Sequence, residues 1–295
     1  MELLTACPVC DYESFTTFIE CPDYFLSKEI FNISKCEKCG FLFTNPRPET
    51  ANLLSYYQSE EYISHSNSRK GFQNIVYQQV RNYTISRKLK LIQNYKKQGS
   101  LLDIGCATGE FLNHCKINKW NVLGIEPDPS ARQNGIRNYS LVIEDEAHLN
   151  NIALASFDVI TMWHVLEHVP ELNERINQLQ KLLRPYGYLF IAVPNANSYD
   201  AKFYGSYWAA YDVPRHLYHF TRDTMTRLFL KHSFSLVKTV PMKFDSFYVS
   251  MLSEKHMHLK NTFFNGFLSG FVSNRAARKN GDFSSLIYVF QKATA

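Results

Sequence analysis

One segment near residue 100 limits the folds open to this 295-residue chain more than any other. An apolar run ends in Asp103, and a turn with Gly105 and Gly109 follows before residues typical of a helix start. A second apolar run then ends in Glu126. This order predicts the βαβ unit that binds an adenosine, with glycines where a Cβ would collide with the ligand. The G-x-x-x-G spacing differs from the G-x-G-x-x-G that seats a pyrophosphate, so we expect a ligand with an amino-acid tail in place of phosphates.

These motifs resemble the class I S-adenosylmethionine-dependent methyltransferases over roughly residues 99–240. The resemblance implies an α/β, doubly wound Rossmann-like sheet of seven strands, the last of them antiparallel, and S-adenosylmethionine as cofactor. In that family an acid equivalent to Asp103 faces the methionyl ammonium, and one equivalent to Glu126 accepts the ribose hydroxyls. The resemblance predicts these cofactor-binding residues: Asp103, Gly105, Cys106, Ala107, Gly109, Glu126, Pro127, Asp145 and Trp163.

Elementary physical chemistry supports one part of this cofactor-site prediction, whereas the role of Asp145 has an alternative. The N-terminus of the helix after the turn offers free N–H groups and a partial positive charge to a ligand carboxylate, which agrees with the implied pose. Asp145 follows a short apolar run where the family keeps an acid near the adenine amino group, but Glu144 and Glu146 flank it. An exposed acidic turn therefore remains the alternative interpretation for Asp145.

Composition excludes several classes of protein. The chain is 45% hydrophobic and 20% charged, as in ordinary globular proteins, and its net charge of +5 is spread over scattered Lys and Arg. This charge distribution does not indicate nucleic acid as a partner, whereas the family resemblance implies a small-molecule acceptor. The N-terminal residues lack the pattern of a signal peptide, and the apolar-leaning stretch 263–272 is too short to cross a bilayer. These features predict a cytoplasmic protein, and they leave the oligomeric state open.

Four of the seven cysteines form two C-x-x-C pairs, Cys7 with Cys10 and Cys36 with Cys39. This is the spacing of a zinc ribbon, in which four thiolates complete a closed tetrahedral site for a structural Zn²⁺. A metal-free knuckle and a redox pair are the alternatives, although redox C-x-x-C motifs accompany a βαβ pattern that is missing here.

The chain divides into three predicted parts. They are a zinc ribbon in 1–45, a linker and helical lid in 46–98, and the methyltransferase core in 99–295, with acceptor-site insertions at 197–221 and 244–280. Within the last insertion, residues 250–278 are expected to be helical, rich in aromatic side chains and basic at their end. They are suited to membrane-surface contacts or to dimer packing, and the sequence does not decide between these.

The run from His164 to His168 spells H-x-x-E-H, a metalloprotease pattern when it lies on a long helix. Here the run follows a predicted strand and is cut by Pro170, so we expect a loop and a single turn. A similar loop in the ubiquinone-pathway O-methyltransferases reads E-x-x-E-H and binds a divalent ion, whereas His164 replaces the first acid here. This run has three interpretations: its side chains pack and contact the cofactor, they serve as metal ligands or as a base, or they form the active site of a protease.

Residues 197–221 should select the acceptor, since they combine aromatic side chains, histidines and Arg215. The Pro-Arg-His-Leu-Tyr-His-Phe run at 214–220 resembles bacterial sugar C- and O-methyltransferases that join a four-cysteine knuckle to the same core. Aromatic faces suit a sugar or a ring, Arg215 suits a carboxylate or phosphate, and a histidine can take a hydroxyl proton. The predicted substrate-binding residues are Glu167, His168, Asn195, Tyr207, Trp208, Arg215 and Tyr218.

The candidate general bases, in order of preference, are His216, His219 and His164. In the alternative interpretation, the histidines of this segment only form hydrogen bonds with loop backbone.

The predicted function is methyl transfer from S-adenosylmethionine to an oxygen or carbon of a small molecule, foremost a sugar or glycan intermediate. One rival is a quinone- or phenol-type O-methyltransferase with a divalent metal near Glu167 and His168. A rival of another class is a zinc-dependent binding module with a non-catalytic core. The glycine spacing disfavours a nicotinamide-linked oxidoreductase.

Overall fold

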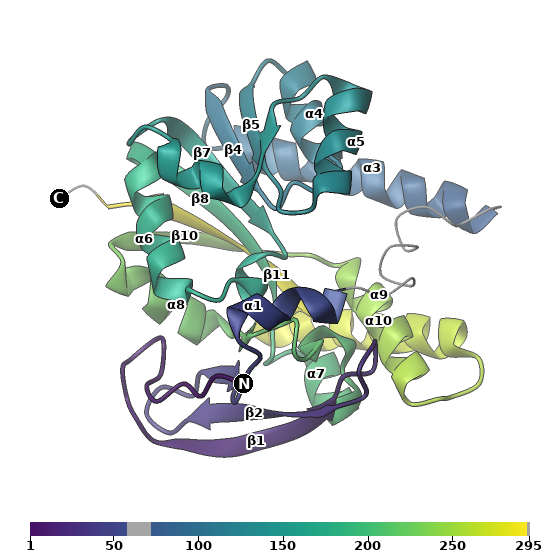
Figure 1. Ribbon diagram of the computed structural model, residues 1–295. Coiled ribbons are helices and arrows are strands. Elements are labelled where there is room, and N and C mark those ends of the chain that lie inside the picture. Colours follow the sequence, from purple (N-terminus) through teal and green to yellow (C-terminus); the bar gives the residue numbers. More distant parts are fainter. Residues whose placement is uncertain (58–71, 294–295) are drawn as a thin grey trace.

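The computed structural model describes residues 1–57 and 72–293. Its centre is a seven-stranded sheet in the order β10-β11-β8-β7-β4-β5-β6 (Figure 1). The strands are β4 (Ser100–Ile104), β5 (Asn121–Ile125), β6 (Ile143–Glu144), β7 (Phe157–Trp163), β8 (Leu183–Pro194), β10 (Phe234–Pro241) and β11 (Ser285–Lys292). β4 to β8 pair in parallel, whereas β11 runs antiparallel to both of its neighbours. The predicted α/β fold with an antiparallel last strand is confirmed.

Helices cover both faces of this sheet. They are α3 (Phe72–Gln93), α4 (Glu110–Ile117), α5 (Pro129–Tyr139), α6 (Leu172–Leu182) and α8 (Arg222–Lys231). Successive strand residues point to opposite faces, so Leu101 packs in the cluster with α3 and α4, and Leu102 in the cluster with α6 and α8. Because both faces are covered, the strands can be apolar throughout, as parallel strands require.

Local sequence explains where several helices begin. Asp128 caps α5 by accepting a hydrogen bond from the N–H of Ala131, and Pro129 takes the first helical position. Thr221 and Thr224 form a reciprocal capping box at the start of α8. Both starts agree with the sequence.

A second, four-stranded sheet carries the N-terminal part, in the order β1-β2-β3-β9. Its strands are β1 (Phe15–Pro22), β2 (Ile30–Cys36), β3 (Leu42–Thr44) and β9 (Tyr218–His219). β9 comes from the predicted acceptor segment, and Phe41 and Phe43 share one core cluster with Leu217 and Phe220. The N-terminal sheet is therefore completed by the segment that was expected to select the acceptor.

Shorter elements and a helical hairpin complete the fold. The elements are α1 (Thr50–Leu53), η1 (Leu54–Tyr57), η2 (Glu146–Asn151), η3 (Leu166–His168), α7 (Tyr199–Tyr204), η4 (Gly205–Tyr207), η5 (Ala209–Tyr211), α9 (Asp245–His256) and α10 (Thr262–Asn280). The expected helix over 250–278 is divided, because the chain reverses between α9 and α10. Residues 58–71 of the expected helical lid lie outside the described residues. In the described part of the chain, no helix has the length and hydropathy that a membrane span requires.

Candidate active site

The glycine turn lies directly after β4, at the edge of the sheet where the parallel strands end. Gly105 and Gly109 have φ angles of +71° and +79°, in the left-handed region that glycine adopts without strain. A Cβ on Gly105 would collide with the side chain of Val165, in the loop that follows β7. The turn therefore packs on the loop that carries Glu167 and His168, and it leaves no room for a side chain at Gly105.

Glu126 lies at the end of β5 and is 9% exposed. Its carboxylate accepts hydrogen bonds from the backbone N–H groups of Ala107, at 2.8 Å, and Asp128, at 3.0 Å. Burial raises the pKa of Glu126, and these two donors act against that rise. Each carboxylate oxygen has a second lone pair, so the held carboxylate can still accept two hydroxyl groups, as the predicted ribose contact requires.

Asp103 is buried in β4, and its Oδ1 accepts a hydrogen bond of 2.6 Å from the hydroxyl of Thr161. Burial, with the charge of Glu126, raises the pKa of Asp103 to about 7, while Thr161 and Lys88 act in the opposite direction. A cationic ligand group beside this carboxylate would offset the cost of burying its charge. The donors and acceptors present thus fit S-adenosylmethionine, which carries an ammonium and two ribose hydroxyls.

The other predicted cofactor residues have different surroundings. Trp163, at the end of β7, packs edge-on against Phe111. The Cys106 thiol is buried, and the carbonyl of Pro127 accepts a hydrogen bond from Arg132. Asp145 is exposed and caps η2 by accepting from the N–H of His148, at 3.2 Å. This placement agrees with the exposed acidic turn that the sequence left open, and the adenine contact of Asp145 stays a prediction.

Two charged residues beside this site carried no signal in the sequence. Lys88 comes from α3, and its Nζ lies 4.3 Å from the ring centroid of Trp163. Burial lowers the pKa of Lys88 to about 8, although Asp103 and Asp245 favour its charged form. Asp245 begins α9, and its Oδ2 lies 3.1 Å from Nε2 of His164. Neither residue belongs to a motif, so only the packing of α3 and α9 on the sheet brings them here.

The loop after β7 has the predicted form of an irregular turn followed by η3, and not the long helix of a metalloprotease. His164 has a φ of +59° and lies between Asp245 and Glu167, whose Oε1 is 3.5 Å from its Nδ1. Burial alone would lower the pKa of His164, but the two carboxylates raise it to about 9. An imidazole that is already protonated at neutral pH cannot accept a proton, which argues against His164 as the general base.

Two residues of this loop, Glu167 and His168, lie close to His216 of the acceptor segment. One ligand atom from each lies within 4.8 Å of the other two. The Glu167 side chain is fully buried, and neither of its oxygens has a hydrogen-bond partner in the part of the chain that the structure describes. The neighbouring histidines favour its charge, and the pKa of Glu167 is lowered in spite of burial. Oε1 lies 3.5 Å from the His164 imidazole, and the buried carboxylate has acceptor capacity left on its other side. This cluster is therefore a place where a further proton or a cation would bind.

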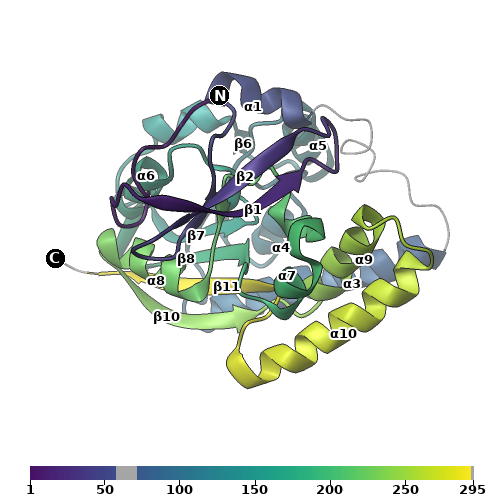
Figure 2. The same ribbon diagram turned by 90° about the horizontal axis from the view of Figure 1, so that it is seen from below.

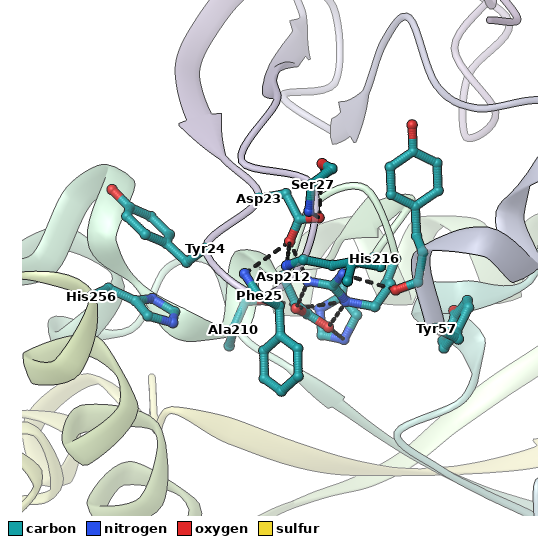
Figure 3. Close-up of polar contacts among 12 residues, drawn as sticks. Asp23, Tyr24, Phe25, Ser27, Tyr57, Ala210, Asp212, His216 and His256 are labelled. Atoms are coloured by element: carbon teal, nitrogen blue, oxygen red, sulfur yellow. Dashed lines mark hydrogen bonds and ion pairs between the residues drawn. The ribbon is translucent and has the colours of Figure 1, made fainter. Parts of the chain in front are cut away.

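In both histidines Nδ1 lies against a backbone carbonyl, and Nδ1 of His168 also lies 2.9 Å from the hydroxyl of Tyr57. Nδ1 of His168 lies 3.1 Å from the carbonyl oxygen of Arg215, and Nδ1 of His216 lies 2.8 Å from that of Ala210. An Nδ1–H that donates to a carbonyl leaves Nε2 of the ring with a free lone pair. Figure 3 shows His216 next to Asp212. Nε2 of His216 is therefore free for a proton or a metal.

The third candidate base, His219, lies elsewhere. It belongs to β9, is 3% exposed, and its Nε2 is 3.2 Å from the hydroxyl oxygen of Thr44. Burial and the charge of His216 lower its pKa well below the ordinary value. The ring also packs edge-on against Tyr211 and has almost no exposed surface, so its base role finds no support in this placement.

Arg215 connects the N-terminal part with the acceptor segment. It is 1% exposed, and its guanidinium donates to Asp23 at 2.9 Å, to Asp212 at 2.6 Å and to the carbonyl of Tyr56 at 3.1 Å. Figure 3 shows Asp23 and Asp212 converging from the two parts of the chain. A guanidinium with these partners is already neutralised, which leaves it little capacity to bind an acceptor carboxylate or phosphate.

Three more of the predicted acceptor residues form internal hydrogen bonds. The indole N–H of Trp208 donates to Asp200, the hydroxyl of Tyr218 donates to the carbonyl of Pro170, and the amide of Asn195 donates to the carbonyl of Phe283. All three are buried, whereas Tyr207 is 39% exposed. Of the predicted acceptor residues, Glu167 and His168 therefore lie in the cluster, Tyr207 is open to solvent, and the remaining side chains support the fold.

The four paired cysteines come together as their spacing predicts. The Sγ atoms of Cys7 and Cys39 are 3.6 Å apart, those of Cys10 and Cys36 are 3.5 Å apart, and all four lie within 4.8 Å of one another. Zinc–sulfur bonds of about 2.3 Å in a tetrahedron place the sulfurs roughly 3.8 Å apart. The arrangement of these thiols therefore fits a zinc ion.

Comparisons with known proteins agree with this geometry. A family model for a methyltransferase domain matches residues 77–239. The chain is 33% identical over 106 residues to the ubiquinone biosynthesis O-methyltransferase of Haemophilus ducreyi, a match that covers 32% of this chain and 45% of the relative. It is 31% identical over 107 residues to the protein of the same name from Vibrio atlanticus, covering 33% of this chain and 44% of the relative. The chain thus spans less than half the length of these curated relatives.

A solved structure extends the comparison to the fold. The structure of an S-adenosylmethionine-dependent methyltransferase from Archaeoglobus fulgidus superposes with a TM-score of 0.51 and 18% identity, and the match covers 75% of this chain and all of the other. At this identity the likeness concerns the fold alone. The family model, however, covers more than half of the 295 residues. On that match, the chain belongs to the class I S-adenosylmethionine-dependent methyltransferase family.

Proposed function

We propose that this protein transfers a methyl group from S-adenosylmethionine to a hydroxyl oxygen of a small molecule. One observation carries the proposal. The glycine turn, with Asp103 and Glu126 beside it, packs through Gly105 on the same loop that brings Glu167 to the two histidines. A cofactor site and a set of proton- or metal-binding groups thus share one loop, which is the arrangement that a group transfer between two bound molecules needs.

The residues on the cofactor side of the site would bind S-adenosylmethionine and orient it. S-adenosylmethionine supplies, when bound, a methyl group on a positively charged sulfur. The carboxylate of Asp103 would hold the amino group of the methionyl part, and the carboxylate of Glu126 the two ribose hydroxyls. The first N–H groups of α4 after Gly109 would face the carboxylate of the ligand. These contacts fix the position of the reacting carbon, and alignment of this kind can lower a barrier by about 7–11 kcal/mol.

His216 is the proposed general base. Its Nδ1 is held by the carbonyl of Ala210, and Nε2 is the free nitrogen. As the acceptor oxygen forms its bond to the methyl carbon and the carbon–sulfur bond breaks, Nε2 would take the hydroxyl proton. Oδ2 of Asp212 lies 4.0 Å from this nitrogen.

Two acceptor classes have support. The run at 214–220 resembles that of sugar methyltransferases, and it favours a sugar or glycan intermediate. The curated relatives are named for ubiquinone biosynthesis, which favours the hydroxyl of a quinone or phenol. The convergence of Glu167, His168 and His216 supports the second class in a specific way, because two imidazole nitrogens and a carboxylate are a common ligand set for divalent cations. In that case His216 is a metal ligand and not the base.

One assay distinguishes these mechanisms. Methyl transfer from labelled S-adenosylmethionine is measured with nucleotide sugars and with catechols as acceptors, before and after treatment with a chelator. If His216 is the base, His216→Ala lowers kcat by about 10²–10⁴-fold without changing cofactor affinity, and the chelator has no effect. If a metal is required, the chelator abolishes activity and Mg²⁺ or Mn²⁺ restores it, while the zinc content of the protein is measured in parallel.

His148→Ala serves as the control, since His148 lies in η2 and outside the cluster. It should leave kcat unchanged. A folded protein that binds S-adenosylmethionine but transfers no methyl group to either acceptor class would contradict the proposed acceptors. One that fails to bind it would contradict the reaction itself and would favour a binding module with a non-catalytic core.

We further propose that Cys7, Cys10, Cys36 and Cys39 bind one structural zinc ion, a role that fits the reduced thiols of the cytoplasm. Cys36→Ser is expected to remove that zinc and to lower the melting temperature, because a structural zinc contributes to folding free energy. Cys21→Ala is the control, since Cys21 is buried in the same part of the chain but lies outside the cluster. It should keep its zinc. Elemental analysis and thermal unfolding measure both effects, and an unchanged metal content in Cys36→Ser would rule the site out.

A further inference from the structure

The outer surface of α10 is unusually apolar for an exposed helix. Five large side chains within its first three turns are each more than half exposed: Phe263, Phe264, Phe267, Leu268 and Phe271. We call these five residues the aromatic face. Figure 2 shows α10 along the outer edge of the molecule, with α9 on its inner side. Exposed aromatic patches of this kind mark contact with another molecule or with a membrane.

The packing of α10 on α9 explains why the aromatic face points outward. The buried positions of α10 are the small residues Gly266, Gly270, Ser273 and Ala277. A Cβ on Gly266 would lie 2.5 Å from Cα of Met251, and one on Gly270 would lie 2.8 Å from Cα of Phe247. The two backbones are therefore in contact, and rotating α10 to bury its aromatic side chains would drive these into α9. The small-residue side is needed for packing, so the aromatic face stays in solvent.

Positive charge is concentrated on the same hairpin. Residues 255–281 contain Lys255, Lys260, Arg275, Arg278 and Lys279 and no Asp or Glu. The chain as a whole has 32 Lys and Arg against 27 Asp and Glu, so the remainder of the chain is balanced at 27 against 27. At about 100° per residue, Arg275 and Arg278 continue the angular range of the aromatic face toward the end of α10. All five cations are exposed.

A groove adjoins this surface. It has a volume of about 280 Å³ and lies between the start of α9 and the second half of α10. Phe244, Phe247, Phe271 and Phe283 line it, together with Lys243, Asn274, Arg275 and Arg278. The groove thus joins an apolar surface to three cationic side chains, the combination that receives an anionic headgroup above an apolar chain.

From these features we infer that the α9–α10 hairpin docks on an anionic phospholipid surface. The aromatic face would lie at the boundary between headgroups and acyl chains, and Arg275, Arg278 and Lys279 would contact lipid phosphates. A second copy of this chain fits the surface less well, since a twofold interface of α10 with α10 would offer these cations no acidic partner: residues 255–281 contain no Asp or Glu. The inference concerns a surface and does not depend on the proposed reaction.

Co-sedimentation of the full chain with lipid vesicles tests this inference. Binding is compared between phosphatidylcholine vesicles and vesicles with 30% phosphatidylglycerol, at low and high salt. The wild type should bind the anionic vesicles, and salt should weaken that binding. Phe263→Ser/Phe264→Ser and Arg275→Gln/Arg278→Gln should each lower the partition coefficient at least tenfold. The four replaced side chains are exposed, so circular dichroism should show an intact fold in both variants.

Matched control variants carry similar changes in the N-terminal part of the chain. Tyr12→Ser/Phe18→Ser and Lys35→Gln/Lys38→Gln replace exposed residues there and should bind vesicles as the wild type does. Equal loss of binding in these variants, or equal binding of the wild type to neutral vesicles, would overturn the inference. The inference would also be overturned if the wild type bound no vesicles and light scattering showed that it forms a dimer, which dissociates in Phe263→Ser/Phe264→Ser. The assay contains no methyl acceptor, so a failure here is distinct from a failure of the proposed reaction.

Discussion

Arg215→Met is expected to lower the free energy of unfolding by about 3–5 kcal/mol, because it leaves buried carboxylates without their counter-charge. Asp23 has no exposed surface, and its Oδ1 accepts from the Arg215 guanidinium at 2.9 Å. Asp212 accepts from the same group at 2.6 Å. Urea denaturation of the wild type and the variant, followed by circular dichroism, measures the difference. Arg215→Lys, which keeps the charge but loses the planar fork, should fall between them.

Arg222→Met is the matched control. Arg222 forms an ion pair with Asp282, but its side chain is 43% exposed, so its removal should cost at most about 1 kcal/mol. If Arg215→Met were as stable as this control and instead raised the KM of the acceptor, the acceptor-binding role predicted from sequence would be correct and the structural role wrong.

The same ion pairs predict how stability changes with pH. Burial raises the pKa values of Asp23 and Asp212, but the Arg215 charge and its hydrogen bonds outweigh this and lower both. Groups whose pKa is lowered in the folded state stabilise it above their unfolded pKa of about 3.9, and that contribution is lost as the pH falls further. The difference between the wild type and Arg215→Met should therefore shrink in acid.

Glu126→Ala is expected to weaken S-adenosylmethionine binding by about 100-fold or more. Two hydrogen bonds from ligand hydroxyls to a charged acceptor are lost, each worth about 1.5–3 kcal/mol. Glu126→Gln should lose less, since one carbonyl oxygen remains and can still accept from the N–H of Ala107. Isothermal titration calorimetry of each protein with S-adenosylmethionine and with NAD measures these affinities.

Asp145→Asn completes this series. Asparagine caps a helix as well as aspartate does, so the variant should keep its stability and, with Asp145 exposed at the start of η2, its cofactor affinity. A large loss of affinity would instead place Asp145 at the adenine, as the sequence predicts. Binding of NAD with an affinity similar to that of S-adenosylmethionine would contradict the cofactor prediction, and equal binding by wild type and Glu126→Ala would contradict the role of Glu126.

The sequence by itself determined the features that depend on neighbouring residues. The strand, glycine turn and helix around Gly105 follow from an apolar run, two glycines and their spacing, and the caps at Asp128 and Thr221 follow from single side chains that bond backbone within one turn. The spacing likewise predicted that each C-x-x-C pair occupies one tight turn, whereas the long-range fold of the N-terminal sheet, in which Phe15 of β1 pairs with Cys36 of β2, places the two turns side by side. Short-range geometry of this kind is nearly independent of the rest of the chain.

Only the tertiary structure decided which side chains are open to a ligand. Arg215 and Asp23 are 192 positions apart in the chain, and no local pattern shows that they pair. The pairing of β9 with β3 buries His219, while His216, three residues earlier, reaches Glu167 and His168. Lys88 and Asp245 enter the site from helices without any motif. Burial and charge pairing depend on the contacts between distant elements, and those contacts are set when the sheets and helices pack together.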